Sequence, residues 1–504
     1  MKVTRLIIFI TSSILSHIMF AQQPAPAGGV KAEKTDRPPA LLEIKESELR
    51  EDLFTLASDT MRGKRAGTLD ELRAAAWLAQ KAQDAGLKPA GDDGTYFQFF
   101  PLERSKVSEE SSFKLNDTQL ELWQDAWIVR PVEKKFDAPV VWFNSLSDTT
   151  KNVKNKVVAM QLIPPSKLPA ENISLYVYRY AHAAIREQVE YLQNKGAAAI
   201  VLVADSTAES KIGFFGHGME EGTYSLTRNR RDLNTQQTTV ILVSSKWASE
   251  LKMQNAKITA NLEVNNYVFP SVNVVAEATG SGPMLKDEYV LFSGHHDHDG
   301  IGVPVEGDSI WNGADDNASV SVAMLAIGRA WVKEPGKRSA LFVWHGAEER
   351  GLFGSRYFVE TPTVPKKSIV AVLNGDMIGR NSPDSAALLG SILPHRNSEE
   401  LVNMALEANN ELTKFNIDTS WDEADHPENW YFRSDHLPYA QADIPAIFFT
   451  TLLHPDYHTP EDEADRIDMA KLVRMTKWMY ATGWKIANTE KAPAIDKKQE
   501  VKKK

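Results

Sequence analysis

The chain has 504 residues, of which 42% are hydrophobic and 25% charged, and its net charge is −10. These values are typical of a globular protein with two or three domains. The acidic balance argues against nucleic acid as a partner, because phosphate binding needs a basic face. The absence of cysteine excludes disulfides and thiolate ligands, so any bound metal must be held by His, Asp or Glu.

The N-terminus has the pattern of an export signal. Lys2 and Arg5 precede the apolar stretch LIIFITSSILSHIMFA, and small or polar residues follow it. We predict a signal peptide over 1–21 and a disordered linker over 22–40. An uncleaved membrane anchor is the alternative. No later apolar run approaches the ~20 residues that cross a bilayer. We therefore expect an exported protein, periplasmic or extracellular, with no stable membrane insertion after cleavage.

Helical spacing of apolar residues begins directly after the linker. It predicts helices over 46–59 and 68–87. Thr68 has the position of an N-cap, with Glu71 three residues on to complete a capping box, and Gly86 closes the second helix.

Two further patterns follow along the chain. Residues 125–265 combine long polar loops with one amphipathic helix over 186–196 and short strands over 138–143, 156–163 and 238–244; within 194–205 a helix stop is followed by a buried strand. From about 270, apolar strands alternate with helices, which predicts a mostly parallel sheet covered on both faces. The lysine-rich residues 487–504 are predicted to be a disordered tail.

Metal-capable side chains stand directly after three of these strands. His295 follows one strand, Glu348 and Glu349 follow a second, and Asp376 follows a third. Ligands bind outside the carboxyl ends of the strands in open α/β sheets, so we expect these groups to converge. The predicted ligands, two imidazoles and three carboxylates suited to zinc, are His295, Asp316, Glu349, Asp376 and His458.

Two of these positions admit other interpretations. On an extended segment His295 and Asp297 share a face, which places Asp297 to orient the ring of His295. The sequence also permits His296 and His298 as a ligand pair. Asp316, in GADDNAS, is either a helix N-cap or a carboxylate that bridges two metals.

The adjacent pair Glu348–Glu349 is the most discriminating feature. Neighbouring carboxylates repel each other unless a cation relieves them. If Glu349 holds zinc and Glu348 takes a proton from zinc-bound water, each has a role. A solvated acidic loop is the alternative, which the neighbouring Trp344, Gly351 and Leu352 disfavour. The pair indicates a hydrolase.

The C-terminal motif LHPDYHTPED supplies His458 and beside it Tyr457, which is placed to donate a hydrogen bond to a developing oxyanion. His436 and His454 are alternative ligands. A nearby group of aromatic residues either lines a side-chain pocket or packs in the core: Trp421, Trp430 and Tyr431.

The motifs SGHHDH, GADDNAS, GAEERGLFGS, LNGDMIG and HPDYHTPEDEADRID resemble, in this order, those of the di-zinc aminopeptidase family, metallopeptidase family 28. The resemblance covers about 270–485. It implies two Zn²⁺ per chain, with His295 and Asp376 on one ion, Glu349 and His458 on the other, and Asp316 bridging them.

The same resemblance assigns supporting roles. It implies Glu348 as general base, Asp297 as support behind the ligands, and a cis peptide between Asp316 and Asn317. Val320 departs from the family, which often has glycine there, and this puts the local helix packing in question.

The resemblance also implies an organisation in domains. The expected fold is the α/β zinc exopeptidase fold, a mostly parallel mixed sheet sandwiched by helices, built from residues 41–124 and 266–486. The block NKGAAAIVLVAD resembles a protease-associated domain, so 125–265 is expected to be a smaller, β-rich α/β insertion.

The function expected on these grounds is that of an exported zinc aminopeptidase acting on peptides. A carboxypeptidase or a glutaminyl cyclase on the same fold is one alternative, although the cyclase works with one zinc and the five-ligand set disfavours it. A non-catalytic peptide-binding envelope protein is another. Structural zinc sites need no spare carboxylate, so Glu348 disfavours that reading.

Overall fold

The computed structural model describes residues 38–148, 151–168, 175–193, 196–226 and 238–497. The predicted signal peptide and most of the predicted linker lie outside these residues. No helix in the described ranges combines the length and apolar character that crossing a bilayer requires.

The first two predicted helices are confirmed. The side chain of Thr68 caps the second one by accepting backbone N–H groups of its first turn. Glu71 reaches back to the N–H of Gly67, at 2.7 Å, and not to that of Thr68, so the capping box is displaced by one residue. Gly86, with φ +82°, ends the helix. The helices are α1 (Glu46–Leu56) and α2 (Leu69–Asp84).

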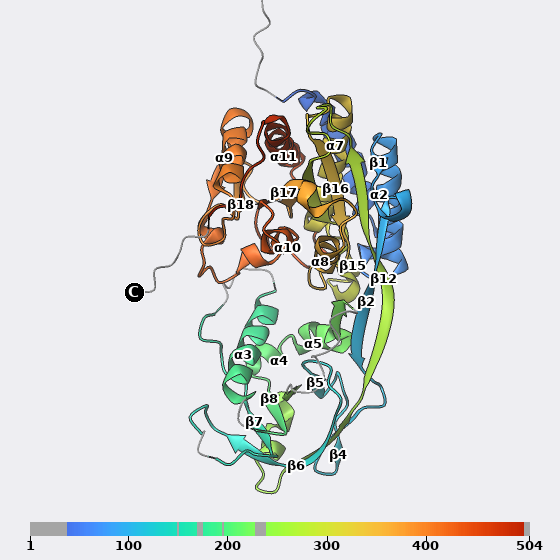
Figure 1. Ribbon diagram of the computed structural model, residues 1–504. Helices are drawn as coiled ribbons and strands as arrows, with labels where there is room; N and C mark the ends of the chain where they lie inside the picture. Colours follow the sequence, from blue (N-terminus) through green and yellow to red (C-terminus); the bar gives the residue numbers. More distant parts are fainter. Residues whose placement is uncertain (1–37, 149–150, 169–174, 194–195, 227–237, 498–504) are drawn as a thin grey trace, which may run out of the picture. The chain divides into compact units, whose positions relative to one another are not determined.

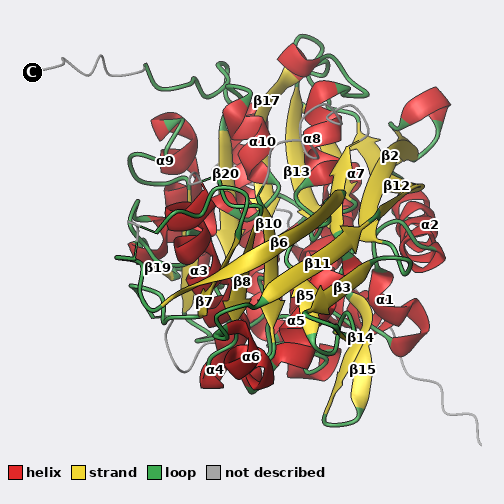
Figure 2. Ribbon diagram, turned by 90° about the horizontal axis from the view of Figure 1, so that it is seen from below, coloured by secondary structure: helices red, strands yellow, loops and turns green. Residues whose placement is uncertain are grey.

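The larger of the two main sheets has ten strands (Figures 1 and 2). Nine of them follow in the order β19-β18-β20-β17-β13-β16-β12-β2-β9, and β1 pairs with β12. The central strands β16, β13, β17 and β20 are parallel, and antiparallel pairs flank them. The strands are β1 (Lys88–Pro89), β2 (Phe97–Val107), β9 (Thr223–Leu226), β12 (Val264–Ala278), β13 (Tyr289–His295), β16 (Ser339–His345), β17 (Ile369–Gly375), β18 (Ser385–Leu389), β19 (Asn416–Asp418) and β20 (Ala446–Thr450).

Helices cover both faces of this sheet. Alternate residues of each strand point to opposite faces. Phe292 of β13 accordingly packs in the core beneath α7 and α11, and its neighbour Leu291 packs with Phe358 of α8 and Tyr439 of α10. This arrangement confirms the predicted α/β fold class. The helices are α7 (Ser319–Lys333), α8 (Phe353–Glu360), α9 (Glu399–Ala408), α10 (His436–Gln441) and α11 (Met469–Asn488).

The strands β2 and β12 form a long antiparallel ladder that the sequence did not predict. Their register runs from Phe97 opposite Val274 to Val107 opposite Val264, and Figure 1 shows the two strands side by side along their length. Charged, asparagine and proline residues interrupt the apolar alternation of both strands, which removes the pattern by which strands are recognised.

A second sheet has eight strands in the order β4-β3-β11-β6-β7-β8-β10-β5, and hydrophobic clusters cover both of its faces. Its first strand begins at Ser112, upstream of the boundary predicted at residue 125. Its helix α3 begins at Tyr176, ten residues before the predicted start. The strands are β3 (Ser112–Leu115), β4 (Thr118–Gln119), β5 (Ala126–Ile128), β6 (Lys134–Phe143), β7 (Val157–Gln161), β8 (Ala199–Val203), β10 (Thr239–Val243) and β11 (Lys257–Leu262).

The helices near this sheet are α3 (Tyr176–Leu192), α4 (Ser206–Glu209), α5 (Ile212–Glu221) and α6 (Ala248–Leu251). A separate two-stranded sheet, β14 (Gly300–Val305) and β15 (Asp308–Trp311), lies between β13 and α7 in the sequence.

The prediction of a disordered tail from residue 487 is wrong for residues 487–497. Helix α11 continues to Asn488, and Arg338 donates hydrogen bonds to carbonyl groups at its end. Asp496 accepts from the guanidinium of Arg396 at 3.0 Å and from the N–H of Glu399 at 2.9 Å. That N–H belongs to the first turn of α9, whose free donors favour a carboxylate. The segment is therefore anchored by specific polar contacts.

Val320, where the resembling family often has glycine, packs against two strand ends. A Cβ atom on Gly294 would lie 2.6 Å from Val320 Cγ1, and one on Gly375 would lie 2.9 and 3.0 Å from its two methyl groups. The bulk on α7 is therefore accommodated by glycines on β13 and β17. Each glycine directly precedes a predicted ligand, His295 or Asp376.

Gly375→Ala should lower the free energy of unfolding by about 1–3 kcal/mol, because the new methyl group overlaps the side chain of Val320. Urea denaturation of Gly375→Ala, Val320→Ala and the double variant tests this contact. Removing the valine methyl groups makes room for the new Cβ, so the double variant should lose less than the sum of the two losses. Additive losses would contradict the packing.

Candidate metal centre

The structure brings all five predicted ligands to the carboxyl edge of the parallel strands. His295 ends β13, Glu349 follows β16 and Asp376 follows β17. His458 lies in the loop after β20, and Asp316 lies in the turn that opens α7. Convergence of groups from separate strands is expected where parallel strands end together.

The ligand atoms form two groups that share Asp316. In the first group, His295 Nε2 lies 3.1 Å from Asp316 Oδ1 and 3.6 Å from Asp376 Oδ1. In the second, His458 Nε2 lies 3.1 Å from Asp316 Oδ2 and 3.2 Å from Glu349 Oε2. The two oxygens of Asp316 therefore face two different histidines, as a bridging carboxylate requires.

The chemistry of these atoms fits a divalent metal. Within the described chain, His295 Nε2 and Asp376 Oδ1 are buried and make no hydrogen bond. The ligand atoms of each group lie within 4.8 Å of one another. Imidazole nitrogens and carboxylate oxygens without thiolates suit zinc, and buried carboxylates at this density need a compensating cation.

The pKa values reflect the same crowding. Burial disfavours the charged form of His295, but the carboxylates of Glu348 and Asp376 outweigh it and raise the pKa well above its usual range. Burial similarly opposes the charge on His458, whose pKa Glu349 raises well above its usual range. Burial raises the pKa of Glu348 well above that of an ordinary glutamate, and the charge of Glu349 adds to this effect. The charge of His295 opposes this shift, but burial and the nearby carboxylates outweigh it, so the surroundings favour the protonated form of Glu348.

Asp297 was predicted to orient the ring of His295 with its side chain, but its backbone carbonyl group makes that contact instead. The Nδ1 of His295 lies 3.1 Å from the carbonyl oxygen of Asp297 and 3.8 Å from its carboxylate. The carboxylate accepts the backbone N–H groups of Glu348 at 3.0 Å and Glu349 at 3.4 Å. One residue therefore holds both the imidazole of one strand end and the acidic pair of the next.

The turn that carries Asp316 is held by a second buried carboxylate. Asp462 accepts the N–H groups of Asp315 and Asp316, each at 3.0 Å. The peptide between Asp316 and Asn317 is cis, as the resemblance implied. Gly313 opens the turn with φ +59°, and a Cβ there would collide with the carbonyl oxygen of Asp316.

Two residues of the HHDHDG segment form a further layer: His298, which the sequence analysis considered only as one of a ligand pair, and Asp299, which it did not identify. His298 Nδ1 lies 2.9 Å from Glu349 Oε1, and Asp299 Oδ2 lies 3.3 Å from His458 Nδ1. A carboxylate behind a metal-ligating histidine is a common orienting arrangement. The alternation of acidic and histidine residues in this segment was the available signal.

The other histidines considered from sequence lie outside the two groups. His296 directs Nδ1 to the carbonyl oxygen of His345 at 2.7 Å, so it does not form a ligand pair with His298. His454 lies against Asp315, at 3.6 Å. His436 packs between Tyr431 and Phe448 (ring centroids 4.9 Å from each).

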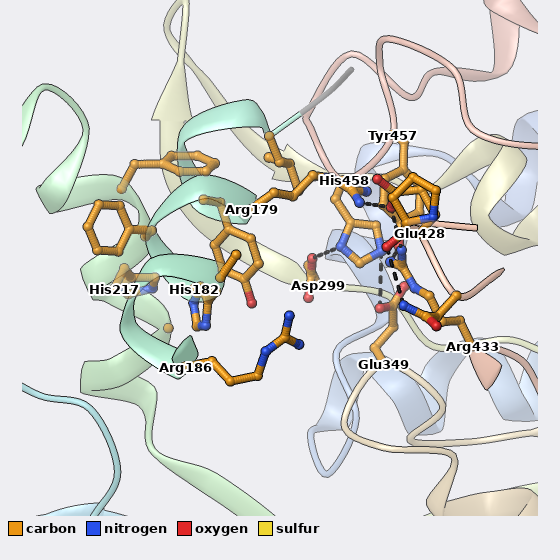
Figure 3. Close-up of a pocket in the computed structure, with 18 of the residues that line it drawn as sticks. Arg179, His182, Arg186, His217, Asp299, Glu349, Glu428, Arg433, Tyr457 and His458 are labelled. Carbon is orange, nitrogen blue, oxygen red and sulfur yellow. Dashed lines mark hydrogen bonds and ion pairs between the residues drawn. The ribbon is translucent and has the colours of Figure 1, made fainter. Parts of the chain in front are cut away.

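A cavity of about 830 Å³ opens beside the second group of ligands (Figure 3). Glu349, Tyr457 and His458 line it on one side, and residues of α3 and α5 line it on another. The hydroxyl of Tyr457 accepts a hydrogen bond from Arg433 at 2.9 Å. The aromatic residues considered for a side-chain pocket do not line this cavity and pack in a hydrophobic cluster instead: Trp421, Trp430 and Tyr431.

The fold and this geometry define a class: an α/β protein with a candidate centre for divalent metal at the carboxyl edge of its sheet, beside the further buried carboxylate of Glu348. Comparison with known proteins is more specific. Residues 273–482 match the model of Peptidase family M28. The matched region is the one whose motifs carry the resemblance to this family.

Curated relatives carry related names. Aminopeptidase YwaD of Bacillus subtilis (strain 168) is 28% identical over 195 residues, which cover 37% of this chain and 40% of the relative. A protein of Trichophyton verrucosum named "Probable leucine aminopeptidase" is 25% identical over 262 residues, covering 48% and 66%. The matched region thus spans less than two thirds of the length of either relative.

Solved structures share the fold over most of the chain. An aminopeptidase from Aneurinibacillus sp. strain AM-1 superposes with a TM-score of 0.56 at 16% identity, covering 91% of this chain and 96% of that one. BSAP, a zinc aminopeptidase from Bacillus subtilis, gives 0.55 at 17% identity, covering 90% and 98%. At these identities the likeness establishes the fold.

Asp462→Ala should destabilise the protein by at least about 1–3 kcal/mol, because it leaves buried N–H groups of the Asp316 turn without an acceptor. It should also weaken metal binding, since the turn no longer fixes Asp316. Urea denaturation and titration of the metal-free protein with Zn²⁺ measure the two effects. Asp462→Asn retains one acceptor oxygen and should lose less in both; equal losses would contradict this role.

Proposed function

We propose that the chain is a zinc-dependent aminopeptidase that removes N-terminal residues from peptides and binds two Zn²⁺. The observation that carries the proposal is the placement of Asp316, whose two oxygens face His295 and His458, with Glu348 beside them. The aminopeptidase names of the curated relatives support it.

Five residues would hold the metal, in the grouping described above: His295, Asp316, Glu349, Asp376 and His458. Bound there, zinc would supply Lewis acidity and lower the pKa of a water molecule toward ~7.

Glu348 is proposed as the general base. Its Oε2 lies 3.9 Å from His295 Nε2, and with His295 and Glu349 it forms a further set of ligand atoms within 4.8 Å of one another. The carboxylate is therefore at the centre without being needed as a ligand in either group. It accepts the proton of the attacking water and passes it to the leaving amine nitrogen.

Tyr457 is proposed to stabilise the oxyanion. Because its hydroxyl oxygen already accepts from Arg433, the hydroxyl proton remains available for donation to the oxygen of the scissile carbonyl. The ring of Tyr457 stacks on that of His458, with centroids 3.9 Å apart, which holds the hydroxyl beside the metal centre.

Glu348→Gln should keep its zinc and lose about 10²–10⁴-fold in kcat, because the amide cannot accept a proton. Turnover of amino-acid p-nitroanilides and metal content by plasma mass spectrometry are measured on the same preparations. A variant with bound zinc and near-normal turnover would refute the assigned base.

Blocking the substrate N-terminus should abolish hydrolysis, because an aminopeptidase needs the free amine at its metal centre. Matched peptides with free and acetylated N-termini, assayed with and without chelator, test this by identifying the released residue. Release of the C-terminal residue from the acetylated peptide would instead establish a carboxypeptidase. Binding without any cleavage would support the non-catalytic alternative.

We also propose that the protein is exported and that residues 1–21 are removed. The charged and apolar pattern of those residues supports this. N-terminal sequencing of the protein from separated cell fractions tests it. We further propose that the eight-stranded sheet is a protease-associated domain, since it is a compact mixed sheet inserted between β2 and β12.

A further inference from the structure

The cavity beside the metal centre is lined by groups of opposite charge on facing walls. Figure 3 shows Glu349, Asp299 and His458 on the side of the metal centre. Helix α3 supplies the facing wall with the side chains of Arg179 and Arg186, between which His182 lies in sequence. A ligand with an amine at one end and an anion at the other would match this division.

Most guanidinium groups that line the cavity are already paired. Arg179 and Arg433 both contact the carboxylate of Glu428, the latter at 3.2 Å. Arg350 donates to Asp299 at 2.8 Å. The pair of Arg179 and Glu428 joins α3 to the facing wall, and all three cations are partly neutralised.

Arg186 differs from them. Among the described residues it has neither an ion pair nor a hydrogen bond, and Figure 3 shows its guanidinium projecting into the cavity. The adjacent Glu187 forms no ion pair with it and instead accepts from the N–H of Ser166 at 2.8 Å and from its hydroxyl at 3.0 Å. The cavity therefore contains a guanidinium whose donors are free for a ligand.

The positive charge of Arg186 also affects the pKa of the nearby His182. Although His182 is exposed to the cavity, desolvation by the protein atoms around it lowers its pKa to about 4, and the positive charges of Arg130 and Arg186 add to this effect. The imidazole is neutral near pH 7 and offers a hydrogen bond without adding or removing charge. An incoming anion thus meets uncompensated positive charge and polar donors together.

We propose that Arg186 binds a carboxylate of the peptide substrate beyond the scissile bond. The proposal rests on the aminopeptidase function, which places the substrate amine at the metal centre. The cavity extends from that centre to α3, so the rest of the peptide would lie toward this helix. A planar guanidinium binds a carboxylate through two parallel hydrogen bonds. The preferred substrates are therefore short peptides that carry a carboxylate within the cavity, either at their C-terminus or on an acidic side chain.

The kinetic test compares peptides that differ only in that charge. Leu-Gly-Gly and its C-terminal amide report the terminal carboxylate, and the amides of Leu-Asp-Gly and Leu-Asn-Gly report the side chain. In the wild type, the charged member of at least one pair should have a kcat/KM about tenfold higher, mainly through KM. Arg186→Gln should bring that ratio close to one. Arg186→Lys should give an intermediate ratio, because it keeps the positive charge but cannot form the two parallel hydrogen bonds of a guanidinium.

Arg50→Gln is the matched control, since it removes the same charge from the exposed surface of α1 and should leave the ratio unchanged. Thermal melting of each variant verifies folding. A wild type that cleaves both members of each pair equally would overturn the proposal, as would an unchanged preference in Arg186→Gln. A wild type that cleaves none of the four peptides, nor any p-nitroanilide, would instead refute the aminopeptidase function itself, and the proposal with it.

Discussion

The arrangement of parallel strands brings carboxylates close together, and much of the surrounding structure compensates their negative charge or holds them in place. Because β13, β16 and β17 end at the same edge, Glu349 and Asp376, which follow β16 and β17, each have a ligand atom within 4.8 Å of Asp316 and of an imidazole. Buried charges at this density repel each other unless cations and fixed dipoles compensate them. The histidines supply part of the positive charge that compensates these carboxylates, and a bound divalent metal would supply the rest.

Backbone groups hold these carboxylates in place. Asp297 and Asp462 are fully buried, and each uses its oxygens on the N–H groups of a turn that carries a site residue. Several residues of the turns and loops at this edge of the sheet also have positive φ without being glycine, including Ala347, Met377 and His458. Such conformations are costly and persist where the surroundings determine them strongly. The metal centre is therefore held by backbone geometry as well as by its side chains.

The sequence predicted the ligands better than their supports. His295, Glu349 and Asp376 could be found because each directly follows an apolar strand, and strand ends are recognisable from local pattern. Asp462 and Asp299 escaped notice since their roles depend on contacts with distant segments. Asp297 was correctly predicted to lie beside His295. Its carboxylate, however, accepts the N–H groups of Glu348 and Glu349 after the next strand, and local sequence does not specify such a contact. The ladder of β2 and β12 was missed for the related reason that its strands lack apolar alternation.

Chemistry and substrate selection arise from different parts of the chain. The residues proposed to act on the scissile bond follow strands of the larger sheet, whereas α3, inserted between β2 and β12, contributes Arg179 and Arg186 to the same cavity. The contact of Arg179 with Glu428, shared by Arg433, links that helix to the loop before α10. Arg433 in turn binds the hydroxyl of Tyr457. A substrate anion that drew Arg179 away from Glu428 would alter the partner of Arg433. Helix α3 is therefore connected through three hydrogen bonds to the group proposed to stabilise the oxyanion.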